Sequence, residues 1–269
     1  MVDQEYQPFG RRRLLYFLGM PDCIFCPNPA DSVEHVFPQW VLDRKKLGPS
    51  RFHFGNRPER VADIDLTVKS VCGACNNGWM SDLENDAKPI LQSMFGDRKI
   101  SLDQNKQVVL IAWLMKIVFL NDTTRGRDAA ARFYRREETL AFGKSREMPN
   151  FTMVSIGHLT DIRRAITGTQ FKTTDERGTL TGLATTLTNE HLVAQIVTLS
   201  LEPEPEGPAT IELTMAPGNW DSMLSRIWHP EPSQIDWPPA VSFTNSGPTA
   251  YAHLLDRFRI GQRVAPPVP

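Results

Sequence analysis

The chain has 269 residues, with 30 lysines and arginines against 31 aspartates and glutamates, so its formal net charge is −1. Hydrophobic residues make up 41% and charged residues 23%, the proportions of an ordinary soluble globular protein. These values exclude an intrinsically disordered chain, a collagen-like fibre and a small disulfide scaffold. A near-zero net charge argues against a generally basic nucleic-acid coat, although it is compatible with a local basic groove.

Signals for export or membrane insertion are weak. Three arginines at 11–13 precede a short apolar stretch at 14–20, which is at the lower limit for a signal sequence and is followed by no small-residue cleavage site. The longest apolar run, residues 108–120, is interrupted by Lys116 and is too short to span a bilayer. We therefore expect a cytoplasmic protein that is not associated with a membrane.

The four cysteines form two pairs with the spacing of zinc ligands. Cys23 and Cys26 enclose two residues, as do Cys72 and Cys75, and two such pairs complete a tetrahedral sulfur site. Disulfides are disfavoured in a cytosolic chain with this paired spacing, and a redox motif would not need two copies. We therefore predict one structural Zn²⁺ on all four cysteines. The 45 residues between the pairs exceed the usual gap of a zinc ribbon, so this insert is expected to contain further structure.

A carboxylate, a histidine and a carboxamide accompany these cysteines. Glu34 and His35 open the segment EHVFPQW, and Asn76 directly follows Cys75 in the segment CNNGWM. Carboxylate and amide oxygens suit Mg²⁺ or Mn²⁺, and histidine, with its near-neutral pKa, can deprotonate a water molecule. A divalent ion with a general base is the minimal equipment for hydrolysing a phosphodiester.

Together these motifs resemble the HNH (His-Me finger) endonucleases, in particular a four-cysteine zinc-binding type similar to the phage recombination endonuclease VII class. The resemblance covers residues 20–90, roughly a quarter of the chain. It implies a ββα-metal unit, in which a hairpin bears the histidine and a helix bears the last metal ligand. It also implies that Glu34 and Asn76 bind a catalytic Mg²⁺ or Mn²⁺, that His35 is the general base, and that the cysteines hold a separate structural zinc.

One position departs from the family pattern. Related HNH proteins often carry a middle asparagine a few residues before the second cysteine pair, and this asparagine helps to fix the histidine loop. Here Thr67 or Lys69 stands at that place. A backbone carbonyl is then the alternative group for orienting His35.

Several residues in this region have alternative interpretations. Asn76 is also suited to cap the helix that follows it, and Asn77 is the shifted alternative for the metal ligand. Glu84 is expected to be a surface or buried polar residue, with a place near the metal as the less favoured interpretation. His53 has no adjacent carboxylate and is expected at the surface.

After the insert, the pattern first predicts helices. Residues 82–94 are predicted to form a helix that Pro89 kinks or breaks. The segment SLDQ (101–104) has a capping-box pattern and predicts a second helix that ends near residue 120 and is apolar on nearly all sides. Residues 129–141 are predicted to form an amphipathic helix.

From residue 151 onward, β-branched and alternating apolar residues predict strands. These strands are residues 151–157, 168–173, 180–187, 192–201 and 210–215. Short helices are predicted for residues 220–228 and 249–259, with proline-rich chain between them. Four histidines show no spacing typical of ligands and are expected to be structural or at the surface: His158, His191, His229 and His253.

The sequence therefore predicts an α+β protein of two parts. Residues 1–98 are predicted to form a four-cysteine, zinc-stabilised ββα-metal nuclease unit. Residues 99–269 are predicted to form an α+β domain of unknown role with an antiparallel sheet, helical over 101–141 and strand-rich over 151–215. The expected activity is hydrolysis of DNA phosphodiesters, with RNA as the alternative substrate, and a homo-oligomer is compatible with the sequence. The alternative function is a zinc-stabilised nucleic-acid-binding or interaction module without catalysis.

Overall fold

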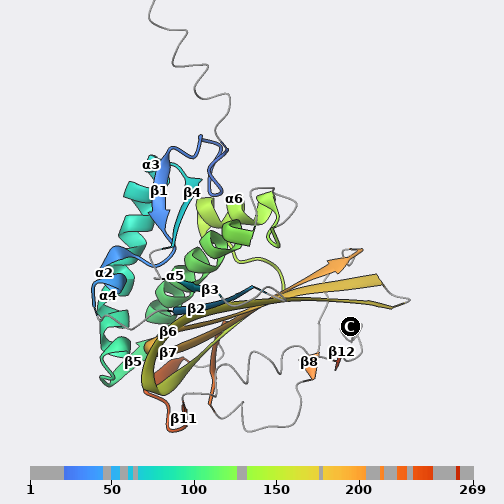
Figure 1. The fold of residues 1–269 in the computed structure, drawn as a ribbon. Coiled ribbons are helices and arrows are strands. Elements are labelled where there is room, and N and C mark those ends of the chain that lie inside the picture. The colour runs from blue at the N-terminus through green and yellow to red at the C-terminus, as the bar shows by residue number, and fades with distance from the viewer. Residues whose placement is uncertain are drawn as a thin grey trace, which may run out of the picture.

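The computed structural model describes the following residues: 21–44, 50–54, 60–62, 66–125, 132–175, 178–203, 213–214, 223–228, 233–244 and 259–260. They form helices and mostly antiparallel strands, which confirms the predicted α+β class. The helices gather on one side, and a long pair of strands lies on the other (Figure 1).

A hairpin and a helix carry the two cysteine pairs. Strand β1 (Ser32–His35) pairs antiparallel with β4 (Thr67–Val71). The chain then enters α3 (Gly73–Cys75), passes through η1 (Asn76–Met80), in which Gly78 departs from helical geometry, and continues as α4 (Ser81–Phe95). The start of this helical segment therefore lies beside the hairpin (Figure 1).

Helix α4 is continuous over 15 residues, so the predicted break at Pro89 is wrong. A proline inside a helix removes one backbone hydrogen bond. Pro89 lies on the exposed face, where water can hydrate the carbonyl group left without its partner. The opposite face is held in the core on both sides of the proline, by residues that include Ala87 and Ile90.

The central helix of the molecule is α5 (Gln104–Asp122), which follows β5 (Ile100–Asp103). All residues from 110 to 122 are buried, as the apolar pattern predicts. The carboxylate of Asp103 caps the helix by accepting a hydrogen bond of 2.9 Å from the backbone N–H of Lys106. The helix thus begins two residues later than the predicted capping box, because β5 takes up the preceding residues in a strand.

Within the described residues, one helical stretch is long and apolar enough to cross a membrane, namely residues 104–125. It comprises α5 and η2 (Thr123–Arg125). Of its most apolar window, 78% is buried inside the protein, as expected for a core helix.

Helix α6 (Arg136–Ser145) packs closely on the first cysteine pair. A Cβ atom added to Gly143 would lie 2.0 Å from the carbonyl oxygen of Phe25, so only glycine permits this approach. The predicted helix 129–141 is thus shifted toward the C-terminus, and its first residues lie outside the described part of the chain.

A single long hairpin organises the strand-rich part. Strand β6 (Thr152–Asp175) pairs antiparallel with β7 (Gly178–Glu202) almost along its whole length. The four strands predicted between residues 151 and 201 are therefore segments of two. The ladder is irregular between His158 and Arg163, so the hairpin has two sections.

Three short strands occupy the second edge of β6. Strand β9 (Ser225–Trp228) pairs antiparallel with it, whereas β11 (Ser242–Phe243) and β2 (Ser50–Phe54) pair parallel. The prediction of a helix over 220–228 is wrong, because the open edge of β6 offers backbone partners to a segment that turns the apolar side chain of Ile227 into the core.

The predicted helix 249–259 lies almost wholly outside the described residues. The other short elements are α2 (Gln39–Leu42), β3 (Arg60–Ala62), β8 (Leu213–Thr214), β10 (Gln234–Trp237) and β12 (Arg259–Ile260).

One hydrophobic cluster joins the two predicted parts. It extends from Cys23 beside the hairpin, through α5, to Trp237 in β10. The division at residue 98 stays a prediction, but the core crosses it. We therefore expect the cysteine motif and the sheet to depend on each other for stability.

Candidate metal centre and adjoining polar site

The four cysteine side chains converge between the hairpin and the start of the helix. Their sulfur atoms all lie within 4.8 Å of one another, and the Sγ atoms of Cys26 and Cys72 are 3.5 Å apart. A tetrahedral zinc ion with Zn–S bonds of about 2.3 Å holds its sulfurs about 3.8 Å apart. Small side-chain rotations therefore suffice for one ion to bind all four. The cysteines are positioned to hold a metal ion such as zinc.

Backbone contacts hold the two pairs in place. Cys72 caps α3, because its Sγ accepts a hydrogen bond of 3.4 Å from the N–H of Cys75. Arg136 of α6 donates hydrogen bonds to the carbonyl oxygens of Cys23 and Cys26, the latter at 2.9 Å. A side chain 110 residues further along the chain thus fixes the first cysteine loop.

Burial and mutual contacts shift the pKa values of these thiols in different directions. Burial raises the pKa of the Cys23 thiol to about 11 and also raises the pKa of Cys75. Burial opposes ionisation of Cys72 as well, but hydrogen bonds from the Cys75 N–H and from neighbouring thiols outweigh it and lower the pKa of Cys72. A bound divalent ion supplies the charge that stabilises several thiolates together.

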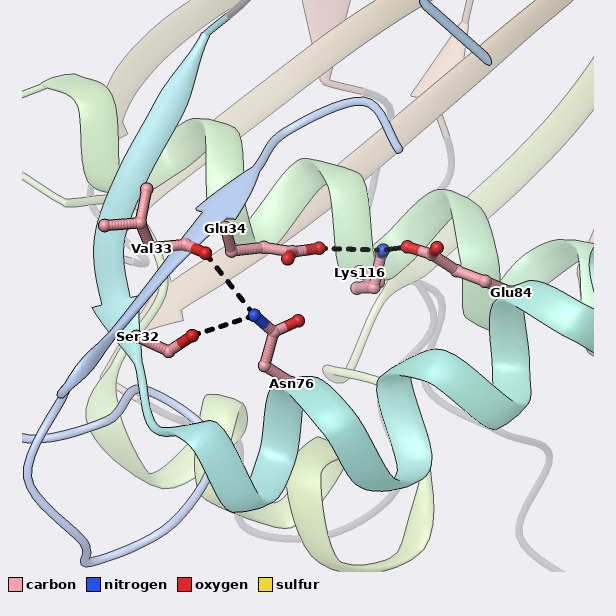
Figure 2. A network of polar contacts seen from close by, with 6 residues as sticks. All are labelled: Ser32, Val33, Glu34, Asn76, Glu84 and Lys116. Carbon is pink, nitrogen blue, oxygen red and sulfur yellow. Dashed lines mark hydrogen bonds and ion pairs between the residues drawn. The ribbon is translucent and has the colours of Figure 1, made fainter. Parts of the chain in front are cut away.

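The Glu34 side chain turns inward to a buried lysine. Lys116 of α5 is fully buried, and its Nζ lies 3.5 Å from Oε1 of Glu34 and also pairs with Glu84 of α4 (Figure 2). Burial raises the pKa of the Glu34 carboxyl group, while the Lys116 ammonium opposes this rise. One ammonium group therefore serves two carboxylates that come from β1 and α4.

In the sequence, Lys116 stands out only as an interruption of an apolar run, and this pattern does not indicate its role. A signal was nevertheless present, because a lysine within a buried helix needs an acidic partner. The partner itself could not be found in this way, because Glu34 is 82 residues away. Glu84, left between two interpretations, is partly buried and belongs to this group.

Asn76 connects the helix to the strand that carries Glu34 and His35. Its Nδ2 atom donates hydrogen bonds to Oγ of Ser32 at 2.9 Å and to the carbonyl oxygen of Val33 at 3.4 Å. The Asn76 carbonyl oxygen points away from these two acceptors, on the side where the Glu34 carboxylate lies (Figure 2). The fold thus holds the Asn76 side chain against the strand that carries Glu34.

The alternative role of Asn76 as a helix N-cap is wrong. Cys72 is the N-cap of α3, and α4 is preceded by Met80, with Asn76 already in helical geometry. Its side chain is free to contact the hairpin because the helical segment already begins three residues earlier, at Gly73. Asn77, the shifted alternative for the ligand, is exposed.

His35 lies at the end of β1, half-buried, and in register with Thr67 of β4. Thr67 rather than Lys69 therefore stands across the hairpin from His35. The side chains of Thr67 and Lys69 are both exposed. His53 belongs to a strand of which only the backbone is described.

A cavity of about 170 Å³ lies near the C-terminal end of α5 and is lined in part by Ile24, Phe119 and Thr123. Its lining includes Asp122 and three arginines, Arg132, Arg135 and Arg136. Neither Glu34 nor His35 nor Asn76 lines it.

The chain matches no protein-family model, no curated protein and no solved structure. The fold and the site define an α+β protein with a four-cysteine cluster that can hold a metal ion. Its activity must be inferred from the chemistry of its own residues.

Replacing Lys116 by methionine is expected to lower the free energy of unfolding by about 3–5 kcal/mol, because two partly buried carboxylates lose their common counter-ion. Urea denaturation followed by circular dichroism measures this change. A suitable control is Lys106→Met on the same helix, because Lys106 is 38% exposed in its pair with Asp103. Its expected cost is below about 1 kcal/mol. Equal losses in the two variants would contradict a buried role for Lys116.

Proposed function

We propose that this protein is a metal-dependent nuclease of the HNH type that hydrolyses phosphodiester bonds in DNA. The observation that carries the proposal is the contact of Asn76 with β1. Its partner Ser32 is 44 residues earlier in the chain, and the hydrogen bonds hold the Asn76 side chain against the strand of Glu34 and His35. A carboxylate, an imidazole and an amide oxygen, the groups that metal-assisted hydrolysis requires, therefore come from adjoining backbone segments.

The residues of this site fit a hard divalent cation. Glu34 and Asn76 would hold Mg²⁺ or Mn²⁺ through oxygen atoms, which these ions prefer. When bound, the ion supplies positive charge that stabilises the developing negative charge on the phosphate oxygens. Lys116 engages one oxygen of Glu34, and a carboxylate has a second oxygen that can bind a cation.

Lys116 has a positioning role in this proposal. Burial alone favours the protonated form of Glu34, which is a poor metal ligand. The Lys116 ammonium favours the ionised form and fixes the direction of the carboxylate. Lys116 also forms an ion pair with Glu84, which connects the Glu34–Lys116 pair to α4.

His35 acts as the general base in the proposed reaction. It accepts a proton from the attacking water, for which an imidazole has a suitable proton affinity near neutral pH. His35 lies at the end of β1 and is partly exposed.

The zinc-stabilised binding module is the second candidate. Two features favour it. Glu34 already has a cationic partner in Lys116. Glu34 and His35 are neighbours on β1, and neighbouring side chains on a strand point to opposite faces. In this case, Glu34, Lys116 and Asn76 stabilise the cysteine-bearing hairpin and take no part in catalysis.

The Asn76 variants distinguish the two functions. Asn76→Asp keeps an oxygen donor and is expected to retain Mn²⁺ binding and part of the cleavage of plasmid DNA. Asn76→Ala is expected to lose both, together with about 1–3 kcal/mol of stability, because its hydrogen bonds to β1 are removed. Mn²⁺ titration, cleavage rates and thermal melts measure these effects.

Asn77→Ala is the matched control, since Asn77 is the exposed neighbour. It is expected to bind Mn²⁺ and to cleave DNA like the unmodified protein. If Asn76→Ala binds Mn²⁺ as tightly as the unmodified protein and only melts at a lower temperature, Asn76 is a structural link. The binding module is then the better function.

A further inference from the structure

A second group of metal-ligating side chains lies at the far end of α4. Asp97 follows this helix, and its carboxylate meets the imidazoles of His158 on β6 and His191 on β7. One ligand atom from each residue lies within 4.8 Å of the other two. Helix α4, about 22 Å long for its 15 residues, separates this group from Asn76 and the cysteines. The spacing of these histidines along the sequence is not typical of ligands, and the fold alone brings His158 and His191 together with Asp97.

The irregular point of the long hairpin brings the two histidines together. Between His158 and Arg163 the ladder loses its register, so that four residues of β6 oppose His191 alone. Such irregularities bend a strand and redirect its side chains. Glu190 adopts a φ of 50°, which is rare outside glycine, and Arg44 holds its buried carboxylate at 2.6 Å. As a result, the rings of His158 and His191 stack with centroids 5.4 Å apart.

Both imidazoles are oriented through their Nδ1 atoms. Nδ1 of His191 donates to the carbonyl oxygen of Leu159 at 2.7 Å, which in the neutral ring leaves the lone pair on Nε2. Nδ1 of His158 lies 2.8 Å from Oγ of Ser242, which the parallel pairing of β11 places beside it. Metal-bound histidines characteristically bind a carbonyl, carboxylate or water through their second nitrogen, and the Leu159 contact follows this pattern.

The remaining nitrogen of His158 faces the carboxylate. Its Nε2 lies 2.8 Å from Oδ1 of Asp97, whose side chain is 47% exposed. The three ligand atoms thus come from three backbone segments. The exposed side chain of Asp97 has room to rotate. An ion at this place would be bound from one side by protein and would be open to water on the other.

We propose that Asp97, His158 and His191 form a binding site for a divalent transition-metal ion such as Zn²⁺. Two imidazole nitrogens and one carboxylate oxygen suit zinc and neighbouring transition metals, whereas Mg²⁺ and Ca²⁺ prefer oxygen alone. Zinc bonds of about 2.0–2.2 Å place ligand atoms about 3.4 Å apart. Rotation of the exposed Asp97 side chain adjusts the position of its oxygen, and the two rings, which stack with an interplanar angle of 5°, tilt so that both Nε2 atoms face the ion. The fourth position is left to water. This site does not depend on the proposed nuclease activity.

Cobalt is the probe that separates this site from the cysteines. The full chain, with zinc already bound, is titrated with Co²⁺ while the absorption spectrum and the ring signals of the histidines are recorded. Thiolate-to-metal bands would report exchange at the cysteines. We expect a further equivalent of Co²⁺ to bind without such bands and to perturb the signals of His158 and His191.

Three variants test the ligand set. Ser242→Ala removes a residue that supports a ligand and is expected to weaken Co²⁺ binding about 10–100-fold. Asp97→Asn changes a ligand itself and is expected to weaken Co²⁺ binding by at least as much. Asp236→Asn is the control, because Asp236 is an exposed carboxylate on β10, and it is expected to have no effect. Thermal melts without added metal establish that each variant is folded. If Asp97→Asn does not fold, the result for Ser242→Ala decides the test.

Either of two metal-binding results would overturn the proposal. One is a full chain that binds metal only at the cysteines. The other is equal Co²⁺ affinity in Asp97→Asn and Asp236→Asn. His158 also lies between Ser242 and Asp97, with one ring nitrogen hydrogen-bonded to each, as the histidine of a nucleophilic serine triad does. Labelling of Ser242 by a fluorophosphonate, without any added metal binding, would assign the cluster to that chemistry instead.

Discussion

Cys72→Ser is expected to unfold the whole described core and not only the hairpin. Structural zinc sites contribute on the order of 10 kcal/mol or more to folding, which is comparable to the entire stability of a typical domain. Cys72 also caps α3 through its sulfur atom, and the hydrophobic cluster that contains it continues to β10. Loss of the site therefore removes support from α5 and from the sheet packed on it.

The measurement is circular dichroism in the far and near ultraviolet, with metal content determined on the same samples. The unmodified protein is expected to contain zinc on the cysteines and to unfold in a single transition when a strong chelator removes it. Cys72→His is the matched variant, because it retains a zinc ligand, and it is expected to keep part of the structure. A Cys72→Ser variant that melts like the unmodified protein would show that the cysteines do not hold a structural ion.

His35→Ala is expected to reduce DNA cleavage about 10²- to 10⁴-fold, the usual effect of losing a general base. Folding is expected to change little, because His35 is half-buried at the end of β1 and lies outside the main hydrophobic cluster. Initial rates on supercoiled plasmid, measured with Mg²⁺ or Mn²⁺, give the size of the effect. Added imidazole is expected to restore part of the rate by replacing the missing base.

Val33→Ala is the control for this experiment. Val33 lies on the same strand with 58% of its surface exposed, and the carbonyl group that Asn76 contacts is unchanged by the substitution. It is expected to cleave DNA normally. Should His35→Ala cleave as fast as Val33→Ala, His35 is not the base, and the active-site proposal loses its central residue.

Local patterns were informative where neighbouring residues decide the structure. The run of apolar residues around Trp113 predicted a buried helix, and α5 is buried over residues 110–122. Patterns failed where distant residues compete. Residues 225–228 form a strand because β6 offers an open edge, and α4 continues through Pro89 because its other face is packed in the core.

The sequence by itself determined the four-cysteine cluster, because two CxxC pairs can satisfy one tetrahedral ion only by coming together. It also placed Glu34, His35 and Asn76 near that cluster, since each lies within twelve residues of a cysteine. Only the tertiary structure decided the partners of Lys116, which lie 32 and 82 residues away on other elements. The same holds for Asp97 and His158, 61 residues apart, which meet because the long hairpin bends beside the end of α4. Spacing along the chain specifies geometry over a few residues, whereas contacts between distant segments depend on how helices and strands pack.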